Sequence, residues 1–272
     1  MGSIFWLDLR ETLRARWFQI FIGGFASLLA IFFALGIAES QILGFTGLGR
    51  TLLTFIQISL VILPGFVLIA TSRSLVADRE SGVLEYLLAM PVSLNGYFWG
   101  KFAARALAFA GPLVFFLWAA ALWNMGRGGT VPVGAVLYFI ALIVSLVVFF
   151  LAVAMAISFF ARSQEMAVGL SFVVWLLAEA LIDSLLLGAL VRGAMPPEMV
   201  MSLSLLNPIQ TFRVAAFSLF DPELTALGPL ALTVAEDMGI TRLRVWALVW
   251  PAASAVFVTL LTCRFFFRRD VV

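Results

Sequence analysis

The chain has 272 residues, of which 63% are hydrophobic and 12% are charged, with a formal net charge of +2 and a mean hydropathy of +1.11. Charged residues make up about a quarter of an ordinary soluble domain, so this composition excludes a soluble globular protein and predicts a polytopic membrane protein. The basic balance does not indicate a nucleic-acid partner, because the basic residues stand at the ends of apolar runs, where they orient a chain in the bilayer.

Histidine is absent from the sequence, and cysteine occurs once, at Cys263. The chain therefore lacks the usual general base, the commonest metal ligand and the usual partner of a nucleophilic serine. Serine–histidine proteolysis and histidine-ligated metal hydrolysis are excluded, and we expect no metal site and no cofactor in this chain. Cys263 lies in an apolar run, where we expect it to pack as a small hydrophobic residue.

Six apolar runs follow one another along the chain. Each has the roughly 20 residues that about 30 Å of hydrocarbon requires of a helix. Because backbone polar groups in lipid must be satisfied within the segment, we expect an all-α protein with about six spanning helices, forming a single transmembrane domain over residues 1–272. The runs cover residues 17–38, 51–71, 102–123, 134–161, 166–191 and 245–267.

Residues 3–16, before the first run, predict an amphipathic helix in the membrane interface. Phe5, Leu9 and Leu13 recur at four-residue spacing, and the charged residues fall on other faces. A frayed leader is the alternative, but the sustained period favours the helix. The first run is too long for the core of a cleavable signal, so we expect it to be retained as a span.

The basic residues are shared unevenly between the two sides of such a bundle. With both termini in the cytoplasm, eleven Lys and Arg residues lie inside and six outside, whereas the reversed topology contradicts the rule that basic residues stay inside. This orientation places residues 73–97 in the cytoplasm and residues 192–244 on the external side.

The segment 73–97 brings charge between two apolar runs and contains the pattern of a short amphipathic helix, which we expect to lie along the cytoplasmic membrane face. The apolar stripe of this helix consists of Val83, Leu84, Leu87 and Leu88, and Glu80 and Glu85 fall away from it. Pro91 ends the helix because proline cannot donate the next backbone hydrogen bond, and Ser93 can cap the helix that follows. A surface helix that leads directly into a span can transmit its own displacement to that span.

The external segment 192–244 contains its own turns and helices. Pro196-Pro197 stiffens the exit from the fifth run, and Pro208 can take the first position of a short helix over residues 209–220. The segment is either a packed cap over the external mouth or a landing place for an external partner, and both readings stay open.

Glu179 and Asp183 lie four residues apart in the fifth run, on one face of a helix. Carboxylates inside a membrane are costly and mark pathways or proton relays. We expect them either to line a translocation path or contact a partner, or to pair with external arginines near the end of the span.

Two further patterns are weaker. Met195, Met199 and Met201 sit together, and thioethers bind copper(I), but nine methionines in so apolar a chain make such clustering ordinary. The sequence from Gly96 to Lys101 is one residue shorter than a phosphate-binding loop, so we expect no nucleotide site.

The sequence DRESGVLEYLLAMPVS at residues 78–93, followed by Gly100-Lys101, resembles the signature of ABC-2 type transporter permeases. The usual form is E-x-G-T-x-E-x-L-L-x-x-P-V-S followed by G-K, and Val83 stands where threonine is common. The resemblance extends over the six-span plan, the N-terminal amphipathic helix and the external helices before the last span.

This resemblance implies a type V exporter-like permease fold in the bacterial inner membrane, with two copies of the permease forming a dimer. Two separate ABC ATPase subunits, which would hold ATP and Mg, dock under the cytoplasmic loops, so no residue of this chain would be catalytic. The ATPase-coupling surface implied by the motif consists of Asp78, Arg79, Glu80, Gly82, Glu85, Leu87, Leu88 and Pro91.

A narrower resemblance links the chain to the permease of the transporter that serves copper-site maturation of nitrous oxide reductase. It rests on Asp183 in the fifth run and on the turn Leu205-Leu206-Asn207-Pro208 followed by Arg213. It implies an external, periplasmic copper-handling partner protein that contacts Asn207, Pro208 and Arg213, with the metal chemistry residing in that partner.

Three other functions remain as alternatives. The chain could be an ABC-2 exporter of a lipid, a polysaccharide or a drug-like molecule. It could instead be an intramembrane enzyme that uses Glu179 and Asp183 as acids, or a structural anchor for an external complex, which would not need the cytoplasmic amphipathic helix.

Overall fold

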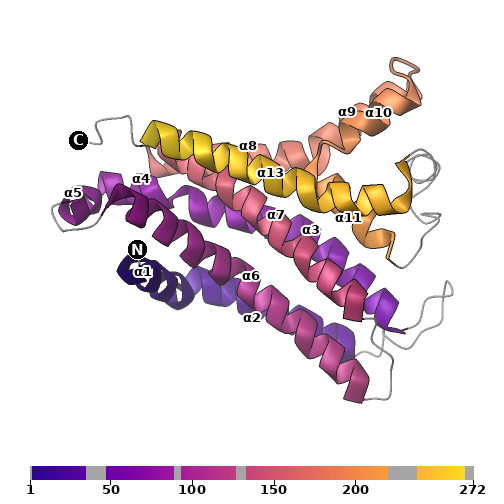
Figure 1. Cartoon of the computed structure of the whole chain (residues 1–272), viewed down its shortest axis with the longest axis horizontal. Helices are drawn as coiled ribbons and strands as arrows, with labels where there is room; N and C mark the ends of the chain where they lie inside the picture. The colour runs from indigo at the N-terminus through magenta and orange to yellow at the C-terminus, as the bar shows by residue number, and fades with distance from the viewer. Residues whose placement is uncertain (1, 35–46, 89–92, 127–132, 220–237, 267–272) are drawn as a thin grey trace.

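The computed structural model describes residues 2–34, 47–88, 93–126, 133–219 and 238–266, and in these ranges the regular elements are all helical (Figure 1). Five described helical segments are long and apolar enough to cross a membrane, and α2 adds a further apolar helix of 19 residues. The predicted all-α fold with about six spans is therefore confirmed. The helices are α1 (Gly2–Arg14), α2 (Arg16–Ala34), α3 (Gly47–Ser72), α4 (Ser74–Glu80), α5 (Val83–Leu88), α6 (Leu94–Gly126), α7 (Val133–Phe160), α8 (Gln164–Leu176), the π-helical turn η2 (Leu177–Leu181), α9 (Ile182–Val191), α10 (Pro197–Ser204), α11 (Pro208–Phe217) and α13 (Ile240–Phe266).

Helix α7 forms the centre of the bundle and packs against α3, α6 and α13. Its sequence is apolar on every face, as expected of a helix that is surrounded by others. A second group of contacts joins α2, α3 and α6 through aromatic rings. Phe21 stacks on Phe66 with centroids 3.7 Å apart, and Phe109 meets Phe66 and Phe18 edge-on. These contacts hold α2 and α6 to the side of the bundle.

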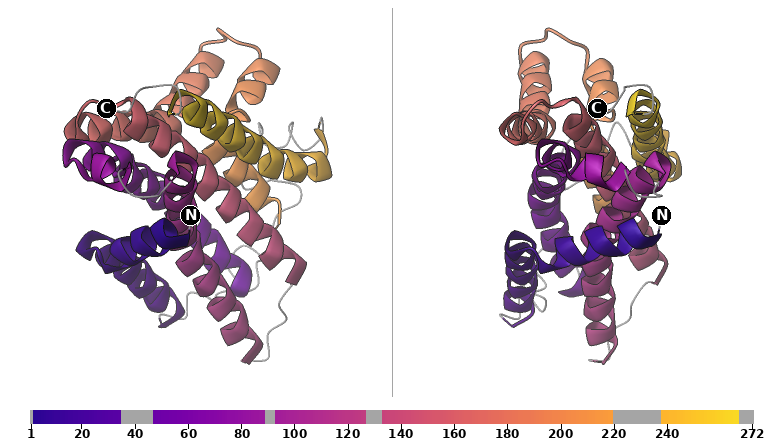
Figure 2. Two further views of the ribbon diagram at one scale, coloured as in Figure 1. Left: turned by 60° about the vertical axis from the view of Figure 1, so that its left-hand side comes forward. Right: turned by 90° about the vertical axis from the view of Figure 1, so that its left-hand side faces the viewer.

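The predicted N-terminal amphipathic helix is confirmed as α1, which lies crosswise to α2 and α6 (Figure 2). Its buried face differs from the predicted stripe. Leu13 is 43% exposed, whereas Asp8 is only 3% exposed and faces α6. The hydrophobic period was a poor guide because Asp8 meets basic partners inside the bundle, which compensates its burial.

The short helix predicted from the stripe of Val83, Leu84, Leu87 and Leu88 is confirmed as α5, and the structure adds a second short helix, α4, before a break at Ser81 and Gly82. Gly82 has a φ of +71°, a left-handed conformation that glycine adopts without a Cβ clash. The prediction that Ser93 caps the next helix is confirmed, since its Oγ accepts a hydrogen bond from the amide of Gly96 at 3.1 Å. The predicted stop at Pro91 lies outside the described residues.

Two helices are longer than their apolar runs. Helix α6 begins at Leu94, directly after the predicted cap at Ser93, although its apolar run begins at Phe102, and α13 begins at Ile240, before the apolar run that begins at Val245. In both cases polar residues extend the helix beyond the apolar run, because their side chains find partners at the ends of the bundle. The external helix predicted over residues 209–220 appears as α11, with Pro208 at its start as expected. Figure 1 shows α9 and α10 projecting from the bundle at the end opposite α4 and α5.

Candidate functional site

Helix α4 is fixed to the C-terminal end of α7 and the start of α8. The Oγ of Ser158, which is fully buried, accepts hydrogen bonds from the amides of Leu75 at 2.8 Å and Val76 at 3.2 Å. These two amides belong to the first turn of α4, where a helix has no backbone acceptors of its own. A hydroxyl on α7 therefore caps α4 across 83 positions of sequence.

The exposed face of α4 carries two of the residues in the coupling motif, and both have partners within the chain. Arg79 donates to the carbonyl of Phe159 at 3.3 Å and to that of Ala161, so it caps the last turn of α7. Glu80 accepts from the side-chain amide of Gln164 at 2.8 Å and from its backbone amide at 3.3 Å. Arg73 donates to the other side of the Gln164 side chain at 3.0 Å. Thus α4 is hydrogen-bonded to both α7 and α8.

Asp78 points into the bundle rather than outward. Its Oδ2 lies 2.5 Å from the Nζ of Lys101 and accepts a hydrogen bond from the hydroxyl of Tyr97 at 2.5 Å. Lys101 also lies 3.6 Å from Asp8, which pairs with Arg105 at 3.2 Å. The exposed fractions of the Lys101 and Asp8 side chains are 9% and 4%, so this is a buried ionic network that links α1, α4 and α6.

Sequence reasoning missed most of this network, although a signal for it exists. Tyr97, Lys101 and Arg105 recur at four-residue spacing, which places them on one face of α6. Arg105 extends the network to α3, because it donates to the carbonyl of Ala70 at 3.0 Å. Such a polar stripe at the start of an apolar helix needs acidic partners, and the sequence offers acidic residues in neighbouring segments. Together these two features could have predicted the network.

Helix α5 presents an apolar surface at the same end of the molecule. Tyr86 is 66% exposed and Val83 is 43% exposed, while Leu84 is buried against the core. Gly82 makes the corner that turns α5 away from α4. The side chains of Glu85, Leu87 and Leu88 are outside the described part of the structure.

The second polar cluster lies towards the opposite end and brings together residues that the sequence had assigned to two roles. Arg213 on α11 is 3.5 Å from the Oε1 of Glu179 on η2 and 3.5 Å from the Oδ2 of Asp183 on α9. One of the two expectations for these carboxylates, pairing with an arginine of the segment 192–244, is therefore met in the structure, and the arginine is Arg213. Two carboxylates meet one guanidinium, which leaves a formal charge of −1.

Three atoms of this cluster are buried without a hydrogen-bond partner among the described residues: Glu179 Oε2, Asp183 Oδ1 and Arg213 Nε. Glu179 lies in a π-helical turn, a feature that is rare and often found at functional sites. Buried polar atoms without partners are costly, so such a group in a native protein calls for an explanation. This cluster is the strongest candidate for a path or switch within the span.

Asn207 and Pro208 position Arg213. The Asn207 Oδ1 accepts from the amide of Ile209 at 3.1 Å and so caps α11, with Pro208 at its first position. The Asn207 Nδ2 donates to the carbonyl of Ala178 at 2.6 Å, which ties α11 to the π-helical turn. Asn207 is 5% exposed, so in this structure it serves α11 and η2 rather than an open external surface.

The three clustered methionines do not all lie on one exposed surface. Met199 is 50% exposed on α10, whereas Met201 is 9% exposed and packs in a core cluster with Leu205, Val214 and Leu243. Cys263 is 6% exposed in the main core, as expected of a small hydrophobic residue.

Comparison with known proteins assigns the chain to a family. The chain matches the family described as ABC-2 family transporter protein over residues 3–271. It is similar to the probable ABC transporter permease protein NosY of Stutzerimonas stutzeri, with 29% identity over 270 residues, which cover 96% of this chain and 95% of the relative. It is also similar to the probable ABC transporter permease protein NosY of Pseudomonas aeruginosa (strain PAO1), with 27% identity over 255 residues, which cover 91% and 92% of the two chains. Because the family match runs over nearly the whole chain, including α4, η2 and α11, the chain belongs to the ABC-2 family of transporter proteins.

Proposed function

We propose that this permease subunit of an ABC transporter couples ATP hydrolysis by separate ATPase subunits to a rearrangement of its spans. The observation that carries the proposal is the attachment of α4. This short helix bonds to α7 through Ser158 and Arg79, to α8 through Glu80, and to α6 and α1 through Asp78. A displacement of α4 therefore reaches four other helices.

The docking face for the ATPase is α5 together with the exposed side of α4. Tyr86 and Val83 supply exposed apolar area, and Arg73, Arg79 and Glu80 surround it with charge. An apolar centre with a polar rim is the usual composition of a protein interface. ATP and Mg are held by the partner in this proposal.

Co-purification tests the docking face. Tyr86→Ser removes the most exposed aromatic ring of α5, and we expect retention of the ATPase to fall about tenfold, as for a central contact of an interface. Met199→Ser, a similarly exposed residue on α10 at the other end, is the matched control and should leave retention unchanged. Equal retention by both variants, with both folded, would refute this assignment.

The working assembly contains two copies of this chain and two ATPases, with both termini in the cytoplasm of a bacterial inner membrane. The excess of basic residues at the end that carries α1 and α4 supports this orientation. Labelling of a cysteine introduced at Ser81 by an impermeant reagent, in intact cells and in inverted vesicles, tests it. Labelling in intact cells would contradict it.

We place a step of the translocation or signalling path at Glu179, Asp183 and Arg213. The three unpartnered atoms and the residual charge of −1 support a cluster that changes partners during the cycle. We expect Glu179→Gln and Asp183→Asn each to lower ATP-driven activity while the chain still binds its ATPase. Wild-type activity in both variants would end this assignment, and it would leave the docking proposal standing.

The specific pathway is copper-site maturation of nitrous oxide reductase. The turn at residues 205–208 followed by Arg213, together with the two relatives named NosY, supports this choice over export of a lipid, a polysaccharide or a drug-like molecule. The external copper-handling partner would bind to the surface formed by α10 and α11. Co-expression with nitrous oxide reductase tests the choice through the copper content of the reductase, and a full copper complement without this chain would refute it.

A further inference from the structure

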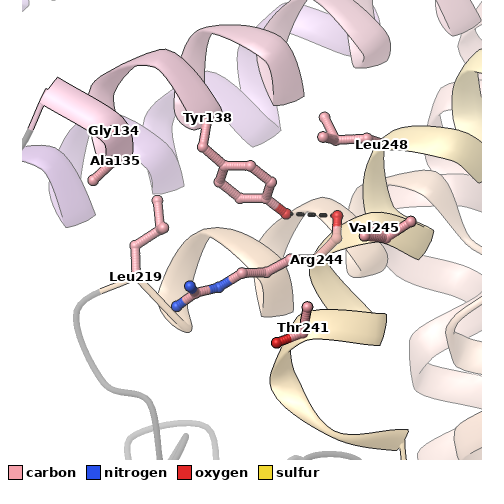
Figure 3. A pocket seen from close by; sticks show the side chains of 8 residues that line it. All are labelled: Gly134, Ala135, Tyr138, Leu219, Thr241, Arg244, Val245 and Leu248. Atoms are coloured by element: carbon pink, nitrogen blue, oxygen red, sulfur yellow. Dashed lines mark hydrogen bonds between the residues drawn. The ribbon is translucent and has the colours of Figure 1, made fainter.

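A pocket of about 470 Å³ lies between the first turns of α7 and α13 and the end of α11 (Figure 3). This volume is within the range of small-ligand sites. The cluster of Glu179, Asp183 and Arg213 does not contribute to its walls. The pocket is lined by Gly134, Ala135, Tyr138, Leu219, Thr241, Arg244, Val245 and Leu248.

The depth of the pocket corresponds to the boundary between lipid headgroups and acyl chains. Helices α7 and α13 both begin beside it, and with a rise of about 1.5 Å per residue Tyr138 lies about 8 Å and Arg244 about 6 Å from the starts of these helices. The other end of α7 meets α4, so the pocket is on the membrane face away from α4. Trp246 and Trp250, which follow on α13, are residues that favour this depth.

Arg244 gives the pocket a fixed positive charge. Its Nε donates to the Oγ of Ser218 at 3.0 Å and its Nη2 donates to the carbonyl of Ser218 at 2.6 Å, which holds the guanidinium in place. Its Nη1 has no hydrogen bond within the described ranges. Tyr138 donates to the carbonyl of Arg244 at 2.9 Å and fixes the backbone from the other wall, as Figure 3 shows.

Among the described residues that line the pocket there is no carboxylate, so within this part of the wall the charge of Arg244 is not balanced. The positive ends of two helices, α7 and α13, lie beside the guanidinium and add to its attraction for an anion. The Thr241 hydroxyl offers a further donor on the same side. The site therefore favours a phosphate over a neutral or cationic group.

The rest of the wall is apolar and partly exposed. Val245 is 55% exposed, and Ala135, Leu219 and Leu248 continue the apolar surface beside it. A soluble anion would leave this surface uncovered, whereas an acyl chain would cover it. We propose that the pocket binds a phospholipid with an anionic headgroup, with its phosphate at Arg244 and Thr241 and one acyl chain along Val245 and Leu248.

Native mass spectrometry of the delipidated full-length chain in detergent tests the proposal. Phosphatidylglycerol and phosphatidylcholine with identical acyl chains are titrated, and glycerol phosphate and inorganic phosphate are added as competitors. One favourably placed basic residue corresponds to a preference of roughly fivefold for the anionic lipid. We expect Arg244→Gln to abolish this preference. Arg242→Gln, which removes the same charge from an exposed position outside the pocket lining, should keep it.

Ala135→Leu provides a second variant that removes no hydrogen bond and fills the pocket, and we expect it to weaken binding of both lipids severalfold. It decides the matter if Arg244→Gln does not fold. Equal binding of the two lipids by the wild type, equal losses in Arg242→Gln and Arg244→Gln, or unchanged binding in Ala135→Leu would overturn the proposal. Displacement of the lipid by millimolar inorganic phosphate would overturn it in favour of a soluble anion.

Discussion

Replacement of Lys101 by methionine is the sharpest test of the buried ionic network that links α1, α4 and α6. Methionine keeps the length of the side chain and removes its charge. Of its side-chain partners among the described residues, Asp78 then loses the ammonium at 2.5 Å and keeps the hydroxyl of Tyr97, whereas Asp8 retains its pairing with Arg105 at 3.2 Å. One carboxylate is thus left largely uncompensated inside the protein.

Loss of one partner from a buried ion pair costs about 3–5 kcal/mol. The Asp78 side chain is 20% exposed, which lets water relieve part of this cost, so we expect Lys101→Met to lower the free energy of unfolding by about 3 kcal/mol. Adding Asp78→Asn removes the stranded charge and keeps an acceptor for Tyr97. The double variant should therefore recover about 2 kcal/mol relative to the sum of the single variants.

Unfolding of the purified chain in mixed micelles of a mild detergent and SDS measures these free energies. Lys101→Arg, which retains the charge, is the control and should lose less stability than Lys101→Met. A loss below about 0.5 kcal/mol in Lys101→Met, or strictly additive effects of the two substitutions, would refute the buried network as a structural joint.

Three further outcomes follow from the contacts. Gly65→Ala should destabilise the bundle by about 1–2 kcal/mol in the same assay, because its Cβ would lie 3.0 Å from the Trp175 indole nitrogen, whereas Gly169→Ala meets nothing within 4 Å and should be neutral or stabilising. Ser158→Ala should cost about 2–4 kcal/mol, since it leaves two amides at the start of α4 without an acceptor, and hydrogen exchange should show faster exchange confined to α4; protection equal to the wild type would contradict this. Arg213→Met should lower stability by about 2 kcal/mol because it strands two partly buried carboxylates, and neutralising both of them should restore most of the loss; an unchanged unfolding curve would count against the cluster.

The spans were predictable because their length and apolar composition are local properties of the sequence. The cap at Ser93 and the start of α11 at Pro208 were predictable for the same reason, since capping residues act within one turn. The direction of Asp78 was not, because its partner Lys101 lies beyond a turn whose path depends on the whole bundle. An amphipathic period describes a helix against water and lipid, and it fails where a buried charge finds an opposite charge.

The polar cluster shows the same limit. The sequence placed Glu179 and Asp183 on one face and named an external arginine as one possible partner, but 30 residues separate Asp183 from Arg213. The amino-acid composition of the π-helical turn η2 does not distinguish it from the α-helices on either side. The path residues Glu179 and Asp183 and the partner-contact residue Arg213, which the sequence kept apart, meet only because α11 packs against η2 through Asn207.

The wide turn at η2 has a mechanical consequence for the fifth span. A π-helical turn holds one residue more than an α-helical turn, and each residue of an α-helix corresponds to a rotation of about 100°. The segment before it is anchored to Glu80 through Gln164, and the segment after it, α9, is joined to α10 by a turn. If the extra residue were to migrate along the span, one half of the helix would twist relative to the other without breaking either attachment. Such a rotation would turn Glu179 or Asp183 away from Arg213, one at a time. A displacement of α4 would then change which carboxylate pairs with Arg213 at the opposite end of the span.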